Sequence, residues 1–76
     1  MEITNGNGAR AFMAAWSGES VARQIRKISG AIESQEKCAQ ICANNGWTEK
    51  ELDHREAIGV LRLGRLRIRQ AAGLHP

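Results

Sequence analysis

Apolar residues recur at intervals of three and four along most of the chain, which is the spacing of one helix face. The clearest stripe consists of Val21, Ile25, Ile28 and Ile32. The same register continues with weaker residues to a turn sequence that begins at Asn44, and Ser17 or Ser20 can cap its start. The pattern permits one long helix over residues 19 to 44 or two helices broken near Ser29-Gly30, because a glycine weakens a helix. The long helix, straight or bent at Gly30, is the favoured prediction.

A shorter helix is expected before this one. Its helically spaced side chains are Phe12, Met13 and Trp16. Ser17-Gly18 supplies a stop signal, so the helix is predicted over residues 9 to 16. Residues 1 to 8 contain asparagines and glycines without apolar periodicity, which is typical of a flexible lead-in or of a loose cap for the helix that follows.

The boundary of the third helix has the most detailed local signals. Asn45 or Gly46 can adopt the left-handed conformation that ends a helix. Thr48 and Glu51 have the spacing of a capping box. Trp47 and Leu52 then occupy the positions of a hydrophobic staple. A new helix is predicted to begin at Glu49.

This helix is predicted over residues 49 to 72, with Gly73 as its stop and residues 73 to 76 as a tail. Residues 65 to 69 alternate strictly between arginine and apolar side chains, which is also the pattern of a half-buried strand. A strand needs partner strands, and only residues 1 to 4 offer a weak one. Helix is therefore the favoured interpretation.

Together these elements predict an all-α fold, a small bundle of about three helices. The chain of 76 residues is short enough for a single domain and for one small core. Hydrophobic residues make up 42% of the chain and charged residues 25%, which is typical of a globular protein. The side chains expected to supply most of the buried area are Trp16, Trp47, Phe12 and the isoleucine stripe.

Charge is distributed unevenly along the chain. Residues 1 to 32 have a net charge of +2, from four basic and two acidic residues. Residues 33 to 56 have three basic and six acidic residues, hence −3. Residues 57 to 76 contain four arginines and no acid, hence +4. The last helix is therefore basic toward its C-terminal end.

Four arginines share one arc of this helix at about 100° per residue. They are Arg55, Arg62, Arg65 and Arg69. Ile58 falls inside the arc and Leu66 at its edge, so we expect both apolar side chains to be exposed there as partner contacts unless another helix covers them. Guanidinium groups suit bidentate recognition of carboxylate or phosphate, which makes this the candidate binding face. The competing interpretation is a solvated face with no partner.

A second basic patch is expected on the preceding helix, at Arg23, Arg26 and Lys27. Nucleic-acid binding by a helix-turn-helix is disfavoured, since the segment that would enter the groove, residues 49 to 56, has a net charge of −2.

Residues for catalysis or metal binding are few. The two histidines have no obvious nucleophile beside them, so no enzyme activity and no cofactor are expected. Cys38 and Cys42 lie four apart on the apolar stripe and are predicted to be buried free thiols. Together with His54 and His75 they fit no common zinc spacing, so no metal is expected. With no secretory signal or membrane span evident, the expected location is cytoplasmic.

These observations predict a non-enzymatic binding protein, a small helical adaptor or inhibitor. It would dock its arginine-rich helix on an acidic surface of a larger complex, and a complex that handles nucleic acid is compatible with this charge. Phage accessory proteins that inhibit bacterial machines, anti-CRISPR proteins included, are chains of this type. The alternatives are a small DNA-binding regulator that uses the same basic helix on phosphates, and a helical subunit that forms a homodimer.

Overall fold

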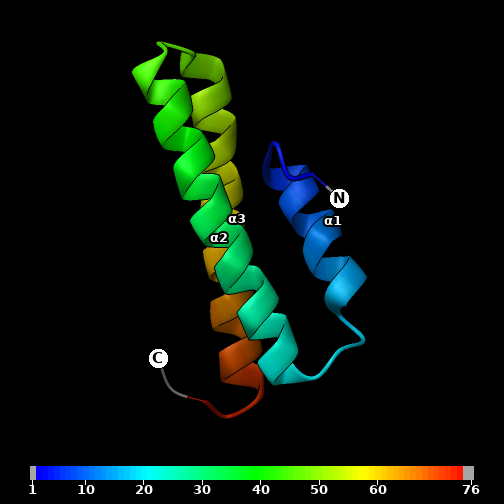
Figure 1. The fold of residues 1–76 in the computed structure, drawn as a ribbon. Helices are drawn as coiled ribbons and strands as arrows, with labels where there is room; N and C mark the ends of the chain where they lie inside the picture. The colour runs from blue at the N-terminus through cyan, green and yellow to red at the C-terminus, as the bar shows by residue number, and fades with distance from the viewer. Residues whose placement is uncertain (1, 75–76) are drawn as a thin grey trace.

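The computed structural model describes residues 2 to 74 of the chain. Its elements are α1 (Gly6–Trp16), α2 (Val21–Asn44) and α3 (Thr48–Ala71). The helices α2 and α3 form a long antiparallel hairpin, and α1 lies beside it, mainly against α3 (Figure 1). The predicted three-helix, all-α fold is confirmed. Residues 65 to 69 are helical, so the strand alternative is wrong.

The first helix begins at Gly6, three residues earlier than predicted. Asn5 is its N-cap, and the Asn5 Oδ1 accepts a hydrogen bond of 2.9 Å from the Gly8 amide. Glu56 on α3 accepts a second one, of 3.1 Å, from the Gly6 amide. These acceptors satisfy amides that a helix start otherwise leaves unpaired. Ile3, just before the helix, is buried in the core. The segment that was expected to be a flexible lead-in is therefore packed against the bundle at this residue.

The long second helix largely matches its prediction. Ser20 is the N-cap, and its Oγ accepts a hydrogen bond of 3.3 Å from the Arg23 amide. The helix continues through Gly30 without interruption. An added Cβ at Gly30 would meet nothing within 4 Å, so this glycine lies on an open side of the helix.

The turn between α2 and α3 is a Schellman motif. Gly46 has a φ of 73°, the left-handed conformation expected at this position. The Trp47 amide donates to the Cys42 carbonyl over 2.9 Å, and the Gly46 amide donates to the Ala43 carbonyl over 3.2 Å. These two bonds satisfy carbonyls at the end of α2.

The predicted capping box is wrong. Thr48 is the first residue of α3 rather than its cap, and Trp47 occupies the cap position without a side-chain hydrogen bond. The side chains expected to form a staple are both largely exposed, Trp47 at 49% and Leu52 at 62%. The Schellman turn places Trp47 directly before the first helical residue, which leaves no extended position for Thr48.

Two substitutions compare the left-handed glycine of the Schellman turn with the capping box that the sequence suggested. Gly46→Ala should destabilise the fold by about 1 kcal/mol or more, because a Cβ disfavours the left-handed conformation. For a domain of this size, that lowers the melting temperature by about 4 to 8 °C. Thr48→Ala should change stability by less than about 0.5 kcal/mol, since no cap bond is lost. Thermal unfolding followed by circular dichroism tests both, and a larger loss for Thr48→Ala would restore the capping box.

The core lies between the hairpin and α1. Its fully or nearly buried hydrophobic residues are Ile3, Ala9, Ile28, Ile32, Ala39, Ala57, Ile58 and Leu61. The expected contribution of the isoleucine stripe is confirmed at Ile28 and Ile32. The expectation for Trp47 is wrong, and Phe12 and Trp16 are only half-buried. Three core residues are alanines without exposed surface, Ala9, Ala39 and Ala57, and such small side chains let helices approach closely. The tryptophans lie near the helix ends.

Along the part of the chain that the structure describes, none of the three helices has an apolar stretch that could cross a membrane.

Candidate functional site

The arginine face, defined as Arg55, Arg62, Arg65 and Arg69, follows the seam between α3 and α2. Two of its members contact α2 directly. The Arg62 Nη2 lies 3.4 Å from the Glu36 Oε1. The Arg65 Nη1 donates to the Ser29 Oγ over 2.9 Å. The face is therefore built by two helices, and its α2 side was missed by sequence reasoning because these partners are far apart in the chain.

The remaining two arginines differ in their surroundings. Arg55 Nε lies 2.7 Å from the Glu51 Oε2, one turn earlier on α3. Arg69 is half-buried and makes no ion pair with residues 2 to 74. Four guanidinium groups on this face thus have two carboxylate partners. The face retains a positive excess that an anionic partner can neutralise.

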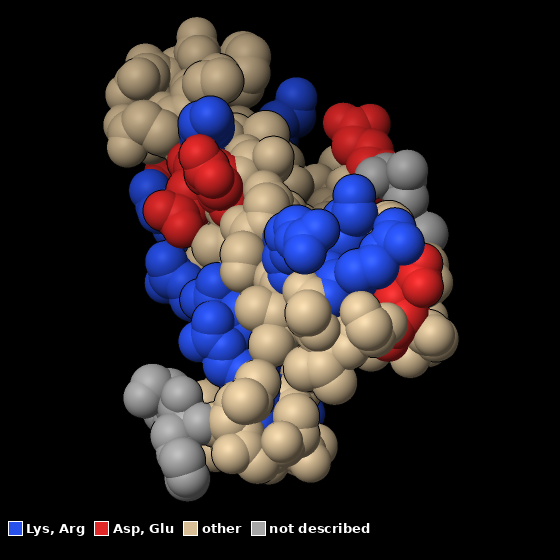
Figure 2. Space-filling model, turned by 60° about the horizontal axis from the view of Figure 1, so that its bottom comes forward, with Lys and Arg blue, Asp and Glu red and all other residues tan. Residues whose placement is uncertain are grey.

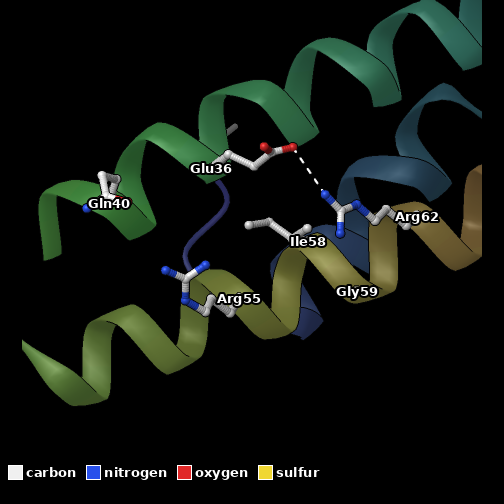
Figure 3. A pocket seen from close by; sticks show the side chains of 6 residues that line it. All are labelled: Glu36, Gln40, Arg55, Ile58, Gly59 and Arg62. Carbon is white, nitrogen blue, oxygen red and sulfur yellow. Dashed lines mark hydrogen bonds and ion pairs between the residues drawn. The ribbon is translucent and has the colours of Figure 1, made fainter. Parts of the chain in front are cut away.

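A shallow hollow opens along this face between the two helices. It is lined by Glu36, Gln40, Arg55, Ile58, Gly59 and Arg62. Figure 3 shows Arg55 and Arg62 on either side of Ile58, with Glu36 and Gln40 opposite them on α2. The side chains of Arg55 and Arg62 are about half exposed, at 51% and 57%, so their guanidinium groups remain accessible to a ligand.

The expectation that Ile58 is an exposed contact residue is wrong. Ile58 is only 6% exposed and belongs to the core. The reason is that α3 packs against two helices, with α2 near Ile58 and α1 near Gly64. Its buried arc is wider than that of a helix with one neighbour. Leu66 is half-buried and stays at the edge of the arginine face.

The second basic patch is mostly engaged in contacts within the protein. Arg23 and Lys27 both lie over the Trp16 ring, at 5.8 Å and 4.9 Å from its centroid. Arg23 also lies 3.8 Å from Glu19. Arg26 is exposed. These cation–π contacts join the end of α1 to the start of α2. Arg23 and Lys27 therefore have a structural role within the protein.

On the face that Figure 2 displays, the basic side chains do not form one continuous surface. Figure 2 shows Lys and Arg in separate groups on the face it displays, with acidic side chains beside them. On this face, an anionic partner would therefore contact particular groups of cations rather than a uniform positive surface.

A buried polar network was missed by sequence reasoning. Gln35 is only 6% exposed, and its Nε2 donates to the Ile3 carbonyl over 2.8 Å. Its Oε1 lies 2.6 Å from the His54 Nδ1, which must therefore be the donor of that bond. The network joins α2, α3 and the N-terminal segment. The available sequence signal was Gln35 itself, a polar residue at a position that continues the apolar stripe of the second helix.

Cys42 is a buried free thiol, as predicted, but Cys38 is only half-buried. Cys38 lies at the edge of the stripe and lines a shallow hollow with His54 and Lys50. Within residues 2 to 74, no three His, Cys, Asp or Glu side chains are grouped to hold a metal ion. His75 lies outside the described residues.

The arginine face combines accessible guanidinium groups with a hollow between α2 and α3, so it remains the candidate site. In comparisons with known proteins, no family model, no curated protein and no solved structure matches this chain.

Proposed function

We propose that this protein is a non-enzymatic binding protein that docks its arginine face on an acidic surface of a larger protein complex. The observation that carries the proposal is the excess of guanidinium groups along the seam of α2 and α3. Four arginines face two carboxylate partners there, Glu36 and Glu51. Each guanidinium has five N–H donors in a fork that matches a carboxylate.

Contacts within the protein also hold two of these arginines in position for binding. Glu36 and Ser29 hold Arg62 and Arg65 across the seam. Holding a long side chain in place reduces the conformational entropy lost when a partner binds. An exposed ion pair such as Arg62 with Glu36 stabilises a fold very little, so an incoming carboxylate can replace Glu36 at small cost.

A protein partner is favoured over nucleic acid by the acidic groups within the site. Glu36 and Glu51 lie among the arginines, where a continuous phosphate backbone would pass close to both carboxylates. A protein surface can present its carboxylates at separate points and avoid these two. An inhibitor of a nucleic-acid-handling complex, of the phage type, is one form that such a binding protein can take.

The proposal is tested by removing charge from the arginine face. Arg62→Gln with Arg69→Gln should weaken capture of the partner from a cell extract by tenfold or more, since desolvated arginines are frequent binding hot spots. Glutamine is preferable to glutamate because a carboxylate at position 62 would face Glu36. Added salt should weaken capture by the wild type.

The matched control is Arg26→Gln with Lys37→Gln, which removes two exposed positive charges from α2. It should bind like the wild type, and both double variants should keep the wild-type melting temperature. Equal capture by the wild type and the arginine-face variant would refute the proposal. Loss of capture after nuclease treatment, together with binding to random duplex DNA, would assign the face to nucleic acid instead.

A further inference from the structure

A second hollow with positive charge lies between α1 and α3. It is lined by Arg10, Met13, Val60, Leu63, Gly64 and Arg67. Arg62 of the arginine face and Arg67 of this hollow are five residues apart, which separates them by about 140° around a helix axis at 100° per residue. The hollow therefore opens on another side of α3 than the arginine face.

The floor of this hollow is apolar. Gly64 brings α1 close to α3, because a Cβ at this position would overlap the Met13 sulfur and terminal methyl group. Met13 thus lies directly over the glycine. Leu63 is 47% exposed, so much of its side chain faces solvent. Val60 is half-buried and completes a floor of aliphatic and thioether groups.

Two arginines border this floor, and the lining contains no acidic residue. Arg10 is exposed, and its Nη1 donates to the Asn7 Oδ1 over 3.0 Å, which leaves its positive charge without a carboxylate partner in the described residues. Arg67 is exposed and makes no ion pair with residues 2 to 74. In the hollow of the arginine face, by contrast, Glu36 already pairs with Arg62.

We propose that this hollow binds an acidic segment of a protein, which inserts an aliphatic side chain between Arg10 and Arg67. Carboxylates flanking that side chain would pair with the two guanidinium groups. The complementarity is one of charge at the border and of apolar surface at the floor. Met13 suits such a site because its unbranched thioether adapts to side chains of different shape. This surface is independent of the proposed function, which uses the arginine face.

The chemistry of the floor favours a protein segment over a nucleic acid. Proteins that bind single strands usually stack bases on aromatic rings. The lining of this hollow contains no aromatic residue. Leucine or methionine from a partner would instead find the aliphatic surface of Val60 and Leu63, where burial stabilises by about 25 cal/mol per Å² of apolar area.

The test uses a synthetic helical peptide of about a dozen residues, with a central leucine flanked by glutamates on the same face. Titration calorimetry gives its affinity, and NMR of the 15N-labelled full chain locates its contacts. The wild type should show shifts centred on Met13, Leu63 and Gly64, with affinity that falls as salt is added. Arg10→Gln with Arg67→Gln should weaken binding by tenfold or more. Leu63→Ser should weaken it several-fold.

The matched control is Arg26→Gln with Lys37→Gln, which removes the same charge from exposed positions of α2 and should change the affinity by less than twofold. Peptide-induced shifts centred on Met13, Leu63 and Gly64 rather than on Arg62 and Arg65 separate this proposal from the proposed function. Equal losses for both double variants would show general charge attraction and overturn the proposal. Equal binding by a peptide with serine in place of leucine would also overturn it, as would no shift at the hollow, or tighter binding there by a single-stranded oligonucleotide of similar length.

Discussion

Leu61→Ala is expected to have the largest effect on stability, a loss of about 2 to 5 kcal/mol. Leu61 is completely buried, and it and Ile28 are the largest fully buried side chains. Truncation of Leu61 removes its packing contacts in the core and leaves a cavity, around which the helices relax only partly. A small domain has about 5 kcal/mol or little more to lose, so a sizeable unfolded fraction should appear at room temperature.

Urea unfolding measures this loss, with Leu63→Ala as the control. Leu63 lies two residues further along α3 and is 47% exposed, so its truncation should cost far less. Leu61→Met keeps most of the volume and should cost less than about 1.5 kcal/mol, which gives a folded variant if the alanine variant fails to fold. Similar losses for Leu61→Ala and Leu63→Ala would contradict the core described above.

Gln35→Ala is expected to cost about 2 kcal/mol or more, because a buried polar group left without a partner costs about 1 to 3 kcal/mol. The substitution removes the partner of the buried Ile3 carbonyl and of the half-buried His54 Nδ1–H. Gln35 thereby connects α2 with α3 and with the segment before α1. The N-terminal segment should loosen together with the loss of stability.

Gln40→Ala is the matched control for this prediction. Gln40 also lies on α2, but its Nε2 bonds to Asn44 Oδ1 over 2.9 Å at an exposed site, where water can replace either group. It should cost less than about 0.5 kcal/mol. Chemical unfolding gives both values, and amide hydrogen exchange near Ile3 reports the loosening. Equal stability of the two variants would show that the Gln35 network contributes nothing.

Arg62 and Ile58 show which properties of a residue a helical wheel predicts and which it does not. The wheel placed both residues on one arc, and both do lie along the seam with α2. The wheel assigned this arc to solvent, however, whereas α2 covers Ile58 and leaves the longer arginine side chains at the border. Side-chain length decides the outcome here, since an arginine can bury its stem and keep its charged end in water.

The sequence by itself determined the number of helices, the course of α2 and α3, and the glycines at which they end. The signals involved act between residues a few positions apart, as in the Ser20 cap and the Gly46 turn. Such contacts form within one helix turn, so their pattern can be read along the chain. The basic character of the second half of α3 was evident because its arginines can be counted along the chain.

Only the tertiary structure decided which side of α3 is buried and which distant partners the arginines and the first amide of α1 have. The Gly6 amide finds its acceptor in Glu56, fifty residues later in the chain. Arg62 finds Glu36 at a separation of 26 residues. These contacts depend on how the helices pack together, because the orientation of one helix against another sets which distant side chains meet. No local pattern records that orientation.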